Sequence, residues 1–158
     1  MSTHSFRTWG TLSALALACM AAPGQPSATQ RLVIEVKPVA RLAVSADPLP
    51  LIVTGSDGAA TDASGKYDIV TNIRTMRITA SIDRPMPEGT SLAIRLESSK
   101  GLSRGSVDIS QATASADVVT AIAPGAEQGE RITYTFSAAG VTSGVDSQSR
   151  VVTLTLTE

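Results

Sequence analysis

Apolar and polar side chains alternate with a period of two in five segments of the chain. The apolar positions are Leu32, Ile34 and Val36; Met76, Ile78, Ala80 and Ile82; Leu92, Ile94 and Leu96; Ile132, Tyr134 and Phe136; and Val152, Leu154 and Leu156. A period of two places every second side chain on the same face of an extended strand. The pattern therefore predicts five β-strands, each with one face toward a core and the other toward solvent.

Shorter apolar runs predict further strands. These runs cover residues 39–44, 51–53, 67–71, 107–109 and 117–122. Stretches containing glycine or proline, which supply the φ angles that turns require, separate the segments at 55–58, 63–65, 85–89 and 124–125. Because no long segment has a helical period, the sequence predicts an all-β fold, an immunoglobulin-like antiparallel β-sandwich of about seven to nine short strands.

The first 28 residues have the organisation of a secretory signal peptide. Arg7 is the only charged side chain among them, and it precedes an apolar run from Leu12 to Ala22. A basic start, a short apolar run and small residues are the parts of such a leader, and this run is too short to span a bilayer. We expect a signal peptide at residues 1–28, cleaved between positions 21 and 28, and a single sandwich domain at 29–158 without a transmembrane segment.

Cys19 offers a second route of export. It follows Ala16-Leu17-Ala18, a stretch that resembles the box in which a bacterial lipoprotein becomes lipidated on cysteine. The usual box has leucine three residues before the cysteine and a small residue two before it, whereas this chain has Ala16 and Leu17. We therefore expect soluble export and keep lipidation of Cys19 as the alternative. Both routes predict a secreted, periplasmic or cell-surface protein.

The composition excludes most catalytic chemistry. The only cysteine, Cys19, the only histidine, His4, and the only tryptophan, Trp9, all lie in the expected leader. Residues 29–158 thus lack the side chains of Ser-His-Asp and Cys-His centres and of the usual zinc and copper sites. Two tyrosines and one phenylalanine are too few aromatic residues to line a sugar cleft. We expect no enzymatic activity and no cofactor.

The charge pattern argues against a nucleic-acid partner. Removing Arg7 from the 13 basic residues leaves 12, against 14 acidic residues, so residues 29–158 carry a formal charge of −2. The basic residues are spread along the chain, whereas a nucleic-acid binder needs a concentrated basic surface. The sequence therefore predicts that the domain does not bind nucleic acid.

The loop at residues 55–65 contains the remote candidates for a metal site. Asp57 and Asp62, with Asp68 beyond them, offer the hard oxygen ligands that Ca²⁺ prefers. Their spacing matches no EF-hand, and aspartate and glycine are also ordinary turn residues. A solvated hairpin loop is therefore the preferred interpretation, with Asp57 and Asp62 kept as possible ligands.

Four features together resemble subunits of bacterial fimbriae of the alternate chaperone-usher type. They are the alternating segment RLVIEV at 31–36, the passage VSADPLPL at 44–51, a domain without cysteine, and the C-terminal segment RVVTLTLTE at 150–158. The resemblance implies an exported, non-catalytic structural or interaction protein of the cell envelope or surface. It also implies that the N-terminal strand fills a groove of the next subunit.

Other interpretations of the same features stay open. Segments such as 31–36 and 150–157 can pair with other subunits or with a cell-surface partner through their edges, the mode called β-augmentation. They can equally complete the sheets of their own domain. The chain is also similar to small uncharacterised secreted β-sandwich proteins. The alternative function is a monomeric secreted binding module with Ca²⁺ or a glycan as its ligand.

Overall fold

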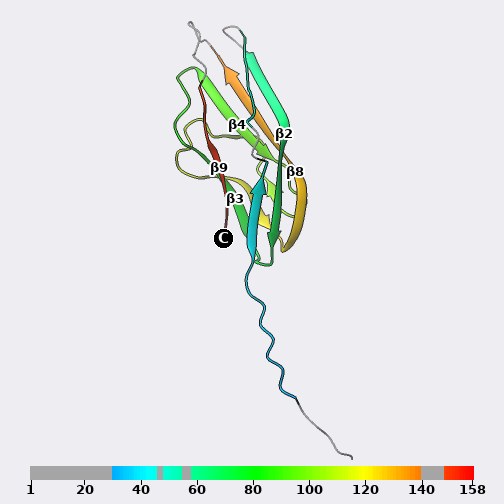
Figure 1. The fold of residues 1–158 in the computed structure, drawn as a ribbon. Coiled ribbons are helices and arrows are strands. Elements are labelled where there is room, and N and C mark those ends of the chain that lie inside the picture. Colours follow the sequence, from blue (N-terminus) through cyan, green and yellow to red (C-terminus); the bar gives the residue numbers. More distant parts are fainter. Residues whose placement is uncertain (1–29, 46–47, 55–57, 140–147) are drawn as a thin grey trace, which may run out of the picture. The chain divides into compact units, whose positions relative to one another are not determined.

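The structure is a computed structural model that describes residues 30–45, 48–54, 58–139 and 148–158. The chain divides into two units, residues 1–35 and residues 36–158. The described part of the second unit contains nine antiparallel strands (Figure 1). They are β1 (Ala40–Val44), β2 (Gly58–Thr71), β3 (Met76–Ile82), β4 (Thr90–Leu96), β5 (Leu102–Ser103), β6 (Val107–Asp108), β7 (Ala116–Ile122), β8 (Gly125–Ala138) and β9 (Val152–Thr157).

The nine strands form two sheets. The first sheet has five strands in the order β1-β2-β8-β4-β6, and the second has four in the order β5-β7-β3-β9. Every pairing is antiparallel, and the two longest strands, β2 and β8, lie side by side along the first sheet. The predicted all-β class is therefore confirmed.

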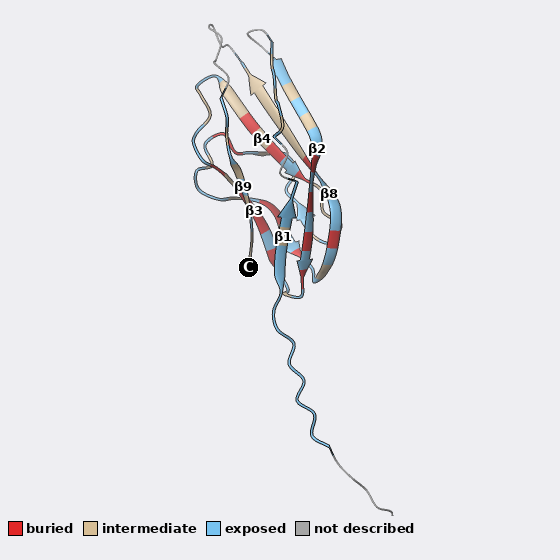
Figure 2. Cartoon of the chain, in the orientation of Figure 1, coloured by how far each residue is buried: buried red, intermediate tan, exposed pale blue. Residues whose placement is uncertain are grey.

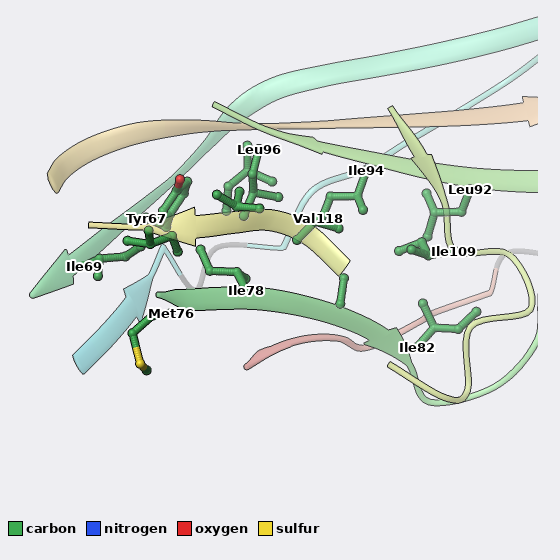
Figure 3. Close-up of a cluster of buried hydrophobic side chains, with 14 residues drawn as sticks. Tyr67, Ile69, Met76, Ile78, Ile82, Leu92, Ile94, Leu96, Ile109 and Val118 are labelled. Carbon is green, nitrogen blue, oxygen red and sulfur yellow. The ribbon is translucent and has the colours of Figure 1, made fainter. Parts of the chain in front are cut away.

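The core lies between the inner faces of the two sheets. Figure 3 shows side chains of β2 and β4 and side chains of β3 and β7 meeting in one cluster. The predicted alternation identifies this face correctly, because Ile78, Ile94 and Ile132 are completely buried. The neighbouring residues Arg77, Arg95 and Arg131 are exposed. Burying apolar side chains of this size stabilises the fold by about 1.5–3 kcal/mol each.

The turn predicted at residues 63–65 is wrong, because these residues lie inside β2. The pairing of β2 with β8 shifts in register between Asp62 and Gly65, which marks a β-bulge. The Asp62 carboxylate accepts hydrogen bonds from the backbone N and the hydroxyl of Ser64, at 2.8 and 2.6 Å. Aspartate, serine and glycine thus form a β-bulge inside a strand that continues beyond it.

Two predicted strands are not strands in the structure. Residues 30–39 are exposed and form no strand, so the prediction that residues 32–36 are a half-buried strand is wrong (Figure 2). Residues 51–53 belong to the segment 48–54, whose residues alternate between exposed and half-buried without joining a sheet. Pro48 and Pro50 in this segment lack the N–H that a strand donates to its neighbour.

Thr75 adopts a strained backbone conformation at the turn before β3. Its φ is 64°, a value that β-branched residues rarely adopt. The left-handed conformation costs non-glycine residues roughly 1–3 kcal/mol, part of which glycine regains at the expense of its larger entropy in the unfolded chain. We expect Thr75→Gly to raise the free energy of unfolding by about 0.5–1 kcal/mol, measured by urea denaturation. Thr120→Gly, within β7, is the control and should lower it.

Candidate functional site

The unpaired edge of β9 is the candidate functional site. β9 is the last strand of the second sheet, and among the described strands it pairs only with β3. β1 is likewise an end strand of the first sheet, where it pairs with β2. The other two end strands, β5 and β6, contain two residues each. β9 and β1 are therefore the edges long enough to accept another strand through main-chain hydrogen bonds.

The inward side chains of β9 are covered on one side only. Val152, Leu154 and Leu156 pack against the core but are half-buried. Their partners on β3 are Ile82, Ala80 and Ile78 in the same order, and these are at most 4% exposed. The difference arises because β3 has a paired strand on both sides, whereas among the described strands β9 is paired on one side only, with β1 of the other sheet approaching it without pairing.

β9 also lacks the features that usually protect an edge strand. Natural edge strands are blunted by charged side chains, proline or a bulge. The sequence of β9 is VTLTLT, without charge or proline, and its register with β3 runs without a shift from Val152 to Thr157. β1, by comparison, carries Arg41. By its sequence and register, β9 is therefore the less protected of these two edge strands.

Asp83 fixes the beginning of β9. The backbone N of Val151 donates to a carboxylate oxygen of Asp83 at 3.0 Å, and the backbone N of Asp83 donates to the Val151 carbonyl at 3.1 Å. The hydrogen bond from Val151 is the main cause that lowers the pKa of Asp83 below its usual value. Arg150 adds a bond from its guanidinium to the Pro85 carbonyl at 3.1 Å. The strand is thereby anchored at its start on the loop that follows β3.

The chain carries an alternating apolar segment that its own sheets do not use. Leu32 is 74% exposed, Ile34 78% and Val36 80%. Val33, on the opposite side of the alternation, is 82% exposed and lies between Arg31 and Glu35. Exposed apolar side chains gathered in one short segment of this kind are a candidate interaction surface.

A buried carboxylate holds the loop between β4 and β5. Glu127 on β8 is 3% exposed, and its Oε1 accepts hydrogen bonds from the backbone N of Lys100 and from the hydroxyls of Ser98 and Ser99. Its Oε2 is buried without a hydrogen-bond partner among the described residues. Nearby, the Tyr67 hydroxyl donates to the Glu97 carbonyl, and burial, followed by the charge of Glu127, raises the pKa of Tyr67.

Sequence analysis did not find Glu127, because its position depends on strand register. Glu127 pairs with Ile69 and Glu130 pairs with Tyr67, so β8 has an extra residue between them. Gly129 lies in this interval with a φ of 66°, and its backbone N donates to the Asp68 carboxylate at 2.6 Å. This bulge reverses the alternation of β8, and the sequence itself offers only the Gly129 signal.

The structure does not bring the predicted metal ligands together. Asp57 and the possible lipidation site Cys19 lie outside the described residues. Asp62 and Asp68 lie six positions apart on β2, about 20 Å of extended strand, although the bulge shortens this distance. The carboxylate of each accepts hydrogen bonds from backbone, Asp62 from Ser64 and Asp68 from Gly129. In the described part of the chain, no group of three or more metal-binding side chains is found.

Comparisons with known proteins found no matching family model, no matching curated protein and no matching solved structure. No helix in the described part of the chain is long and apolar enough to cross a membrane.

Proposed function

We propose that the protein is an exported, non-catalytic structural subunit of the cell envelope or surface, and that its copies assemble by strand addition. In this proposal residues 31–36 of one copy add to the edge of β9 in a second copy. The observation that carries it is the coexistence of an open apolar edge and an exposed apolar segment with the matching period of two.

The strand order supports an immunoglobulin-like sandwich in which the described strands fill all positions but the last. An immunoglobulin-like domain has strands A, B, E and D in one sheet and C, F and G in the other. The order β1-β2-β8-β4 fits A, B, E and D, and the pair β3-β9 fits C and F, with β5, β6 and β7 as additions. In this assignment none of the described strands occupies the position of strand G, which would lie beside β9.

The chemistry of the two surfaces is complementary. A strand beside β9 would cover the half-buried Val152, Leu154 and Leu156 with the apolar face formed by Leu32, Ile34 and Val36. Each well-packed cross-strand pair contributes roughly 0.2–1 kcal/mol, and each fully buried apolar side chain about 1.5–3 kcal/mol. Main-chain hydrogen bonds along β9 supply affinity, while the alternation of side chains sets the register.

A competing peptide tests the proposal. We expect the full-length coding sequence, expressed in a bacterial host and purified from the exported fraction, to form a ladder of oligomers on unheated denaturing gels. A synthetic peptide of residues 30–37 should occupy the edge of β9 and shift these oligomers toward monomers in size-exclusion chromatography. A peptide of the same composition in scrambled order is the control and should leave the oligomers unchanged.

Two results would contradict strand addition. A protein that stays monomeric at high concentration, with reversible unfolding, has no accessible acceptor edge or no donor. Oligomers that resist the ordered peptide as fully as the scrambled one assemble through another surface. The monomeric result would leave the secreted binding module as the alternative, to be tested by calorimetric titration with Ca²⁺.

A further inference from the structure

Among the described residues, Asn72 holds the residues that lead into β1. The Asn72 amide oxygen accepts a hydrogen bond from the backbone N of Val39 at 2.7 Å, and its amide nitrogen donates to the Lys37 carbonyl at 2.8 Å. The backbone N of Asn72 also donates to the Val39 carbonyl at 3.1 Å. Lys37 and Val39 are thus both bound to the residue that follows the end of β2.

These contacts extend the sheet past the point where β2 ends. Ala40 pairs with Thr71, so Val39 faces Asn72 in the same register. β2 ends at Thr71, and a bend leads to β3. The Asn72 side chain therefore takes the place of the next strand residue as the partner of Lys37. Pro38 between the two contacts has a fixed φ and no N–H, which adds stiffness.

This inference rests on the proposed assembly by strand addition. In that assembly the segment of the same chain competes with the segment of a second copy for the edge of β9. A segment tethered by a short linker has an effective concentration of roughly millimolar for a site on its own chain, provided that the linker can reach the site. A second copy at micromolar concentration would lose this competition. Donation between copies therefore requires a feature that disfavours return of the segment to its own chain.

The fold indicates what such a return would require. The C-terminal end of β9 lies close to the beginning of β1, where the segment joins the sheet (Figure 1). To run back along β9 of its own chain, the segment must reverse direction within residues 36–39. That reversal breaks the contacts of Asn72 with Lys37 and Val39 and bends the chain at Pro38.

We propose that Asn72 is a positioning residue that keeps residues 31–36 from occupying the β9 edge of their own chain and so directs them to a second copy. Each of its two side-chain hydrogen bonds is exposed and contributes a factor of about two to ten to the equilibrium between open and self-closed chains. Losing both should raise the ratio of self-closed to open chains about fivefold or more, and assembly should slow in proportion to the fall in the open fraction.

Distance measurements test this directly. Spin labels at Val33→Cys and Thr155→Cys, in a Cys19→Ser background, report the separation of the segment from β9 within one chain, because labelled chains are diluted into unlabelled ones. We expect Asn72→Ala to increase the ratio of the short-separation to the long-separation population at least fivefold over the Asn72 chain. Asn72→Asp keeps the acceptor for Val39 but loses the donor to Lys37. Its short-separation population should lie between those of the Asn72 chain and Asn72→Ala. Arg74→Ala changes an exposed residue of the same bend and is the control. Its short-separation population should equal that of the Asn72 chain.

The outcomes separate the inference from the function. If the Asn72 chain assembles and both Asn72 variants assemble at its rate without a new short-distance population, the positioning role is overturned while strand addition stands. If the Asn72 chain itself forms no oligomers, strand addition fails and the inference fails with it. Equal unfolding midpoints for all the variants ensure that a change in assembly does not reflect loss of the fold.

Discussion

An Ile34→Asp chain is expected to remain monomeric under conditions in which the unmodified chain assembles. Ile34 is the centre of the apolar face formed with Leu32 and Val36, and strand addition would bury it against the edge of β9. The substitution loses about 1.5–3 kcal/mol of burial and adds the cost of desolvating a carboxylate, so affinity should fall at least 100-fold. Sedimentation velocity across a range of concentrations measures the effect.

Val33→Asp is the matched control for this experiment. Val33 is adjacent in sequence, is 82% exposed against 78% for Ile34, and receives the same change of side chain. Because it lies on the opposite side of the alternation, an added strand would direct it away from the core. We expect the affinity of Val33→Asp for assembly to be within about threefold of that of the unmodified chain. An equal loss of affinity in Ile34→Asp and Val33→Asp would indicate nonspecific association of an apolar segment. It would rule out strand addition in a defined register.

Glu127→Ala is expected to cause the largest loss of stability of any single substitution discussed here. The change leaves the backbone N of Lys100 and the hydroxyls of Ser98 and Ser99 without their common acceptor, and it opens a cavity beneath the loop. Hydrogen bonds to a charged group contribute about 1.5–3 kcal/mol each, and the variant no longer buries a charge, so we expect a net loss of about 3 kcal/mol. Urea denaturation followed by far-ultraviolet circular dichroism measures it.

Glu127→Gln separates the acceptor role from the charge. The glutamine amide oxygen can accept the same three hydrogen bonds, while its NH₂ group replaces the buried Oε2, which has no partner among the described residues. We expect this variant to lose about 1 kcal/mol or less, because the loss of one charge-assisted acceptor is offset by not burying a charge. A loss for Glu127→Ala below 0.5 kcal/mol would show that the loop does not depend on this carboxylate.

The core of the fold was predictable because it depends on local alternation. β3 and β4 and the second half of β8 each bury the face that the period of two identifies, from Ile78 to Ile94 and Ile132. Glycine and proline marked several of the turns between strands. Where a bulge intervenes, as at residues 62–65 and at Gly129, the alternation changes phase and the sequence alone is misleading.

The candidate site was predictable only in part. The amphipathic character of residues 32–36 and 152–156 is plain in the sequence, yet both segments have the same pattern and have different environments in the structure. β9 joins a sheet beside β3, while residues 30–39 form no strand. The alternation of side chains indicates that a segment is able to pair as a strand. Whether it pairs depends on whether the fold places another strand beside it.

By itself the sequence determined the all-β class, the inward residues of the central strands and the scarcity of catalytic side chains in residues 29–158. Only the tertiary structure decided that β9 is an end strand among the described strands, that Glu127 is buried and that Asn72 holds the start of β1. The physical reason is that a strand's edge, a buried carboxylate's partners and a side-chain contact across 33 residues are set by pairing between distant segments. Side-chain periodicity reports one segment at a time and contains no information on such pairing.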